Sequence, residues 1–461
     1  MINLIFLMSM LSILFSERGD LISYTFKEVR DASTIQSELE DYISDLADTE
    51  GAQDLITPNA IYDIKLYSIT YQTIDQFGEY TEASGSVALP DNYNFAYPLY
   101  LIGHGTQIRR SSAPSMGGFN LLNQWLTSDG YIYLEPDYLG LGVSEVLHPY
   151  HLKDVTASSM IDMIFAVKSL CDQLAVAQYN HQLFIAGYSE GGYAAMATVK
   201  EIEENYENLE ITMSFPMAGA YDLSGTMVDL MLSEEEYADP FYLPFFILSY
   251  IEKYNLGDID DFFKPEYANI LPDLFSGEYS GSYINDFLPD IPINMMLDDM
   301  VTDFTSNPNF PFKIHLAEND LTNWSPQSPM YLLHGEADER VPVENTYEAY
   351  NSFIQNGSSA DIVKNEILPP ELFGIELGHQ SAAAFCYIIT DQYTSEVQVI
   401  ISRGDINEDL QLNISDIISI INNILNYSDL DNFDFWLNDL NNDSLINIFD
   451  IVLLIEGILN E

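Results

Sequence analysis

The chain has 461 residues, of which 47% are hydrophobic, so it can bury a large core and has room for two or three domains. Its 72 acidic and 15 basic residues give a formal net charge of −57, which repels nucleic acids and anionic membrane surfaces. The apolar content excludes a disordered polyanion. Two explanations of the acidity are open, namely a hydrated surface suited to a salty exterior and drift within a composition rich in Ile, Asn, Asp and Tyr.

The first 16 residues are almost wholly apolar, too short to span a membrane comfortably, and followed at once by Glu17 and Arg18. We therefore expect a signal peptide over residues 1–16 and a secreted or cell-surface protein; an uncleaved anchor is the alternative. No later apolar run reaches membrane length without charges or prolines. Cys171 and Cys386 are expected to be buried free thiols, and a disulfide is the alternative that an extracellular setting permits.

Strand and helix patterns alternate through the central part of the chain. After a helical or irregular lead-in over residues 20–59, residues 61–74 and 81–89 are expected to form a β-hairpin. Further strands are predicted at 97–103, 131–134, 183–186, 211–215, 330–333 and 362–368, with helices at 120–128, 155–174 and 193–205. A leading hairpin followed by β-α-β alternation predicts an α/β fold with a sheet of the α/β-hydrolase type, within a catalytic domain over residues 17–399.

About a hundred residues interrupt this alternation, from about residue 224 to residue 328. The segment has helix-like apolar spacing and an aromatic run at 241–248. Insertions at the carboxyl ends of strands in such sheets face the site, so we expect a helical cap over it. The alternative is a helical elaboration that does not contact substrate.

The stretch GYSEGG, residues 187–192, places the pattern Gly-x-Ser-x-Gly between a predicted strand and a predicted helix. This is the setting of a nucleophile elbow. Gly187 and Gly191 occupy positions where a side chain would collide, and Ser189 is exposed at the end of the strand as the candidate nucleophile. The backbone N–H of Glu190 begins the helix and is a candidate oxyanion donor.

A nucleophilic serine needs a base and an orienting acid, which follow it in the order acid, then histidine, in α/β-hydrolases. Asp338 follows the strand at 330–333, and only one of the seven histidines, His379, comes after it. His379 would take the proton of Ser189, and Asp338 would hold the imidazole tautomer. Glu336 and Asp222 are the alternatives for the acid.

The loop after the strand at 97–103 reads His104-Gly105-Thr106-Gln107. A His-Gly pair at this point is the usual approach to an oxyanion hole. The backbone N–H of Thr106 or Gln107 is therefore the candidate second donor, and His104 is expected to brace the loop. The alternative is a tight turn that requires Gly105.

Taken together, residues of about 60–390 resemble the secreted α/β-hydrolases of the secretory lipase and esterase type. The matching segments are LIGHGT at 101–106, PDYLGLG at 136–142, HPY at 148–150, GAYDL at 219–223, ENDLTNWSPQSP at 318–329, HGEADERVP at 334–342 and the elbow itself. The resemblance implies cleavage of carboxylic esters through an acyl-enzyme on Ser189, without a catalytic cofactor, on a small-molecule or polysaccharide-linked acyl ester. A serine peptidase of the prolyl-oligopeptidase type and an inactive hydrolase fold used for binding are the alternatives.

Residues 400–461 contain a repeat with a period of 34 residues, which begins at Asp405 and again at Asp439, and predict a separate small all-α domain. Each copy has oxygen-bearing groups at loop positions 1, 3, 5, 7, 9 and 12, as in EF-hand calcium loops, followed by an apolar helix. The candidate Ca²⁺ ligands are Asp405, Asn407, Asp409, Gln411, Asn413 and Asp416 in the first loop and Asp439, Asn441, Asp443, Leu445, Asn447 and Asp450 in the second, with Gln411 and Leu445 contributing backbone carbonyls.

Paired loop-helix units with Asp at position 12 resemble a dockerin module. The resemblance implies structural Ca²⁺ and docking to a cohesin-like protein. Position 6 is normally Gly but is Leu410 here and Ser444 in the second loop, and a left-handed backbone at Leu410 would cost about 1–2 kcal/mol. Asx-rich turns without metal, and a surface-retention or sorting tag, are the alternatives.

Overall fold

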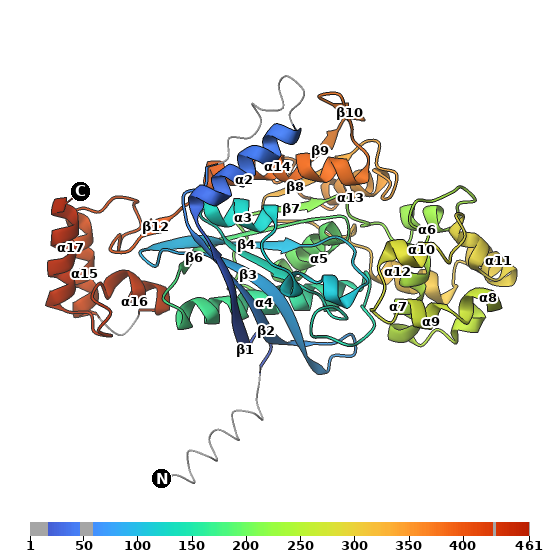
Figure 1. The fold of residues 1–461 in the computed structure, drawn as a ribbon, viewed down its shortest axis with the longest axis horizontal. Coiled ribbons are helices and arrows are strands. Elements are labelled where there is room, and N and C mark those ends of the chain that lie inside the picture. Colours follow the sequence, from blue (N-terminus) through green and yellow to red (C-terminus); the bar gives the residue numbers. More distant parts are fainter. Residues whose placement is uncertain (1–16, 47–58, 427–429, 461) are drawn as a thin grey trace, which may run out of the picture.

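The computed structural model describes residues 17–46, 59–426 and 430–460, so the expected signal segment 1–16 lies outside the described residues. At the centre of the described part is one ten-stranded mixed sheet with the order β1-β2-β3-β5-β4-β6-β7-β8-β9, and β12 pairs with the start of β4 (Figure 1). The first four strands of this order pair antiparallel, and the strands from β5 to β9 pair parallel. This is the α/β sheet with a leading hairpin that the sequence predicts.

The predicted strands agree with the structure to within about five residues, but β1 at the N-terminal edge and the two-residue strands β10, β11 and β12 were not predicted. The lead-in prediction is wrong for residues 21–30, which form β1, whereas the helix α2 (Ala32–Leu46) follows as expected. Most side chains of β1 are exposed, so the strand lacks the inside-outside alternation by which a strand is recognised. The strands are β1 (Leu21–Arg30), β2 (Ile64–Ile74), β3 (Tyr80–Pro90), β4 (Phe95–Gly103), β5 (Ile132–Pro136), β6 (Gln178–Tyr188), β7 (Met213–Met217), β8 (Met330–Gly335), β9 (Val363–Leu368), β12 (Ile401–Ser402) and the separate short pair β10 (Glu371–Leu372) and β11 (Ile375–Glu376).

Helices cover both faces of the sheet. The helices α4 (Lys153–Gln173) and α5 (Glu190–Asn205) pack on one face, and α3 (Leu121–Ser128) and α14 (His379–Val397) pack on the other; α13 (Glu344–Gln355) joins β8 to β9. Both faces of β4 are buried, with Leu99 and Leu101 in one core and Tyr100 and Ile102 in the other. A strand covered on both sides needs a continuous apolar run, which is the pattern seen in the sequence.

The helical insertion lies between β7 and β8, beyond one end of the sheet, and the C-terminal helices lie beyond the opposite end (Figure 1). Its helices are α6 (Thr226–Met231), α7 (Tyr242–Tyr254), α8 (Pro265–Ala268), α9 (Leu271–Leu274), α10 (Gly281–Asn285), α11 (Asp298–Ser306) and α12 (Pro311–Glu318). The hydroxyl of Tyr193 in α5 donates to the carbonyl oxygen of Asn319, 2.9 Å away, just after α12. The insertion is thereby fixed to the helix that follows the elbow.

The C-terminal repeat forms α15 (Ile414–Leu425), α16 (Asn432–Asn438) and α17 (Ile448–Asn460). Ile420, Ile446, Ile451 and Leu454 make a small core of their own between α15 and α17. By contrast, α16 packs through Trp436 and its neighbours on the end of β4. Among the described helices, none combines the length and the apolar character that a membrane crossing requires.

Candidate active site

Ser189 lies at the turn from β6 into α5 with φ 62° and ψ −123°, a strained conformation for a residue other than glycine. The prediction of crowded glycines is confirmed. A Cβ on Gly187 would lie 2.1 Å from the carbonyl oxygen of Gly191, and one on Gly191 would lie 2.0 Å from that of Gly103. Because no side chain fits at either position, the backbone can turn sharply enough to hold the Ser189 hydroxyl above the end of the sheet.

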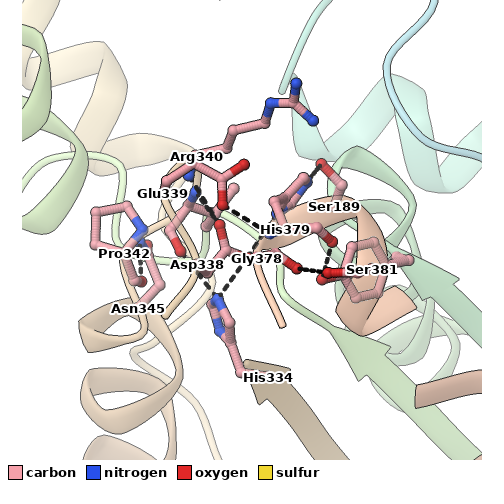
Figure 2. A network of polar contacts seen from close by, with 12 residues as sticks. Ser189, His334, Asp338, Glu339, Arg340, Pro342, Asn345, Gly378, His379 and Ser381 are labelled. Atoms are coloured by element: carbon pink, nitrogen blue, oxygen red, sulfur yellow. Dashed lines mark hydrogen bonds and ion pairs between the residues drawn. The ribbon is translucent and has the colours of Figure 1, made fainter. Parts of the chain in front are cut away.

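The structure brings together the three side chains predicted as a triad (Figure 2). His379, the first residue of α14, has its Nε2 atom 2.9 Å from the Ser189 Oγ atom. Its Nδ1 atom lies 2.6 Å from the Oδ2 atom of Asp338, on the loop after β8. This geometry suits a neutral imidazole that donates from Nδ1 to the carboxylate and accepts the serine proton at Nε2.

Asp338 is held as a carboxylate by several donors. Its Oδ1 atom accepts the backbone N–H groups of Arg340 and Val341, and its Oδ2 atom lies 3.2 Å from the Nε2 atom of His334 as well as beside His379. Burial alone would raise the pKa of Asp338, but the hydrogen bonds from His334 and His379 outweigh it and lower that pKa. The sequence analysis included His334 in a motif without giving it a role. Its position near the end of a buried strand, four residues before Asp338, is the signal that could have identified it.

The two alternative acids are placed elsewhere. Asp222 accepts the backbone N–H and the hydroxyl of Thr226 and so caps α6. Glu336 is exposed on the loop. Of the three candidate acids, Asp338 is the one that contacts His379.

The candidate oxyanion loop follows β4 and lies beside the elbow. The backbone N–H groups of Thr106 and Gln107 have no backbone acceptor among the described residues, and Glu190 is the first residue of α5. His104 braces the loop as expected, with its ring nitrogens 2.7 Å and 3.1 Å from the carbonyl oxygens of Gly105 and Asp137. The alternative of a tight turn that requires Gly105 is wrong, because a Cβ there would meet only one atom, at 3.8 Å.

A buried ion pair underlies the elbow, and sequence reasoning missed it. The Oε1 atom of Glu190 lies 2.6 Å from the Nε2 atom of His148, whose Nδ1 atom lies 2.6 Å from the carbonyl oxygen of Leu139. Burial alone would raise the pKa of Glu190, but the interaction and hydrogen bond with His148 lower it overall. The HPY segment, noted only as part of the family resemblance, therefore supplies the counterion of the residue next to Ser189.

A pocket of about 50 Å³ opens beside Ser189. Residues of the insertion line most of it, including Met227, Leu243 and Phe246, and Glu190 and His151 lie at its polar side. Burial lowers the pKa of His151 to about 3, so this imidazole is neutral. The insertion therefore lines the space beside Ser189, as the cap hypothesis expects. The alternative, an insertion that lies away from the substrate, does not agree with this lining.

The sheet order, the elbow and the Ser-His-Asp contacts are those of an α/β-hydrolase. The structure is similar to that of the rice cell wall degrading esterase LipA from Xanthomonas oryzae, with a TM-score of 0.73 and 27% identity over 83% of this chain and 100% of that one. It is also similar to a putative hydrolase from Legionella pneumophila, with a TM-score of 0.72 and 26% identity over 82% of this chain and 97% of that one.

Lipase A from Candida antarctica in its closed state shares the fold, with a TM-score of 0.59 and 12% identity over 83% of this chain and 82% of that one. No family model matches the sequence, and a search of curated proteins found no significant match. The chain thus has the α/β-hydrolase fold of the LipA and lipase A type, with a helical insertion. These similarities give no support to the dockerin resemblance of the C-terminal repeat.

The two candidate calcium loops share one backbone geometry. Their positions 4 and 6 are left-handed in both copies, with φ values of 57° and 65° at Glu408 and Leu410 and of 57° and 64° at Asn442 and Ser444. The left-handed backbone expected at Leu410 is therefore present. No group of three or more His, Cys, Asp or Glu side chains is arranged to hold a metal ion within the described part of the chain.

Proposed function

We propose that the protein is a secreted serine hydrolase that cleaves carboxylic esters, an esterase or lipase, through an acyl-enzyme on Ser189. The observation that carries this proposal is the continuous hydrogen-bonded chain from Asp338 through His379 to Ser189, beside a pocket lined by the insertion. The similarity to LipA, described as a rice cell wall degrading esterase, favours ester substrates over peptides.

In the proposed reaction, His379 Nε2 takes the proton of Ser189 while the serine Oγ atom attacks the acyl carbon. Asp338 keeps the Nδ1 proton in place and stabilises the imidazolium. The N–H of Glu190 and that of Thr106 or Gln107 stabilise the oxyanion, and one such donor contributes about 3 kcal/mol. His379 then protonates the leaving alcohol, and water, deprotonated by the same histidine, releases the acid.

The size of the pocket beside Ser189 bears on the acyl group. A volume of about 50 Å³ holds about four water-sized groups, so the pocket suits an acyl chain of roughly two to four carbons. An acetyl or similarly short ester is therefore the proposed substrate, carried by a small molecule or by a polysaccharide. The apolar lining from α6 and α7 would exclude water around that chain.

The test is a panel of p-nitrophenyl esters of increasing chain length with the parent protein and Ser189→Ala. We expect kcat/KM to be highest for short chains and to fall by at least about 10⁴-fold in Ser189→Ala. The matched control is Ser395→Ala, an exposed serine further along α14. Cleavage of peptide amides in place of esters would favour the peptidase, and an inactive parent would favour the binding fold.

We further propose that the C-terminal repeat binds structural Ca²⁺ through its two loops. Each loop buries the carboxylates of its positions 1 and 12, which are Asp405 and Asp416 in the first copy and Asp439 and Asp450 in the second. Among the described residues, none of these four pairs with a basic side chain. Buried carboxylates without a counterion favour a cation, and hard oxygen donors suit Ca²⁺.

Calcium binding is tested by calorimetric melting of the full chain with Ca²⁺ and with a chelator. We expect chelation to lower the melting temperature of the repeat in the parent, and to lower it less in Asp416→Ala and in Asp450→Ala, which each lack one position-12 ligand. The control is Glu456→Gln, an exposed carboxylate on α17 outside both loops. A melting curve that chelation leaves unchanged contradicts the proposal.

The proposed role of this module is docking to a cohesin-like protein. The outer faces of α15 and α17 expose an apolar surface that the rest of the described chain does not cover, formed by Ile418, Ile421, Leu425, Val452, Leu453, Ile455 and Leu459. Calorimetric titration with a cohesin domain, with and without Ca²⁺, measures the docking. Retention on cells without cohesin binding would favour the surface-retention tag.

A further inference from the structure

A second pocket, of about 410 Å³, lies next to the candidate active site. Tyr242 and Arg340 line both pockets and so form the partition between them. Thr106 and Gln107 of the candidate oxyanion loop and Gln380, which follows His379, also line the second pocket. The apolar pocket at Ser189 therefore adjoins a second, larger space next to the oxyanion loop.

The lining of the second pocket mixes polar and apolar side chains. Ser112, Ser280, Ser282, Gln107 and Gln380 contribute hydroxyls and amides, beside Ile108 and Phe241. Groups of this kind hydrogen-bond hydroxyl groups and offer little to a hydrocarbon chain. The volume is large enough for a sugar-sized group, and it exceeds by far the space in the apolar pocket.

The charge of this lining differs from that of the chain as a whole. The chain has 72 acidic and 15 basic residues, yet two of those basic residues, Arg109 and Arg340, line this pocket with only one acidic residue, Asp239. The Nε atom of Arg340 lies 2.6 Å from the Oδ2 atom of Asp239, which neutralises one of the two cations. Arg109 has no ion pair among the described residues, and its Nε donates to the hydroxyl of Ser112.

Arg340 also lies close to the reacting atoms. Figure 2 shows its side chain extending from the Asp338 loop over His379 toward Ser189. Its Nε atom pairs with Asp239, and among the described residues its two terminal nitrogens have no hydrogen-bond or ion-pair partner. A guanidinium has five N–H donors in a fixed plane and binds carboxylate or phosphate oxygens in pairs.

We propose that the second pocket binds the alcohol part of the ester and selects an anionic, hydroxyl-bearing alcohol of the sugar-acid class. The inference rests on the proposed ester hydrolysis. Arg109 and Arg340 contact the anionic group, and the serine hydroxyls and glutamine amides contact the hydroxyls. The cut breaks the bond between the acyl carbon and the alcohol oxygen, and the alcohol leaves with a proton from His379.

The test compares kcat/KM for matched acetyl esters with a charged and a neutral alcohol, namely 4-acetoxybenzoate against 4-acetoxybenzamide, and acetylated methyl glucuronoside against acetylated methyl glucoside. We expect the parent to prefer each acid by about tenfold or more, the contribution of hydrogen bonds to a charged group. The preference should fall toward unity in Arg109→Gln and in Arg340→Gln. Lys27→Gln removes one positive charge from an exposed position on β1 and should keep the parent preference.

Arg109 is exposed, so Arg109→Gln carries the test if Arg340→Gln fails to fold. Acetylated glycerol 3-phosphate distinguishes the sources of the anion: a preference for it over both carboxylate-bearing esters would overturn the sugar-acid assignment. Equal rates on charged and neutral esters, or a preference that neither arginine variant changes, would overturn the inference and leave ester hydrolysis standing. A parent that cleaves none of these esters would overturn both.

Discussion

The buried pair of Glu190 and His148 leads to a prediction about stability. Both ring nitrogens of His148 face acceptors, the Glu190 carboxylate and the Leu139 carbonyl, each at 2.6 Å. Glu190→Gln keeps the shape of the side chain and removes its charge. A neutral amide then replaces the carboxylate beside the buried His148 ring, and the short hydrogen bond between the two side chains loses its charge assistance.

The magnitude follows from burial, since both side chains are at least 96% buried. Removing one partner of a buried ion pair costs about 3–5 kcal/mol, which lowers the melting temperature by about 4–6 °C in a domain of this size. The lowered pKa of Glu190 fixes the sign of the pH dependence. The stabilisation that the Glu190 carboxylate contributes is present above its ordinary pKa of 4.5 and is lost as the pH falls through its lower folded-state pKa. The difference in stability between Glu190→Gln and the parent should therefore shrink on acidification.

The assay is a double-mutant cycle of Glu190→Gln and His148→Gln, read by thermal melting at neutral pH with Ca²⁺ held constant. Each single variant leaves the other residue buried without its partner. The double variant should therefore lose less stability than the sum of the losses in the two single variants, by about 0.5–3 kcal/mol. Additive losses, or a Glu190→Gln variant that melts with the parent, would refute a coupled buried pair.

Three further predictions concern other positions. Burial, reinforced by Asp129, raises the pKa of Asp391 to about 7 from 3.8, so the folded state binds the proton of this carboxyl more tightly than the unfolded state does. The free energy of unfolding therefore falls by up to about 4 kcal/mol as the pH rises from about 4 to 7. Asp391→Asn should therefore stabilise the protein at pH 8 and much less at pH 4, measured by urea unfolding. His334→Gln should lower kcat about tenfold with KM unchanged in steady-state assays, because His334 touches Asp338 and does not line the pocket beside Ser189. Leu410→Gly should raise the melting temperature of the calcium-loaded repeat, since it relieves a left-handed backbone that costs about 1–2 kcal/mol.

The central sheet and the triad were predictable because local signals decide them. The apolar run at β4 reflects burial on both faces, and Gly187 and Gly191 are required by backbone contacts near 2 Å. Chain order alone then selected His379, whereas Asp222 and Glu336 also follow strands, and the contact with His379 is what distinguishes Asp338 from them. Each of these inferences uses neighbours within a few residues along the chain or a topological rule.

What the sequence did not reveal depends on contacts between distant segments. The exposed edge strand β1 is defined by its pairing with β2, at a separation of about forty residues, and carries no alternating pattern. The partner of Glu190 is His148, and no motif near either residue in the sequence indicates that the two side chains meet. Likewise, the second pocket joins residues from the oxyanion loop, the insertion and the loop after β8.

The charge of the chain and the charge of the second pocket act over different distances. A net charge of −57 repels an anionic substrate at long range, but salt at physiological strength screens that field beyond about 8 Å. Contacts to Arg109 and Arg340 act at hydrogen-bond distance and are screened far less. A salty exterior would therefore remove the barrier to approach while keeping the selectivity of the pocket, so an acidic surface suited to such an exterior is compatible with an anionic substrate.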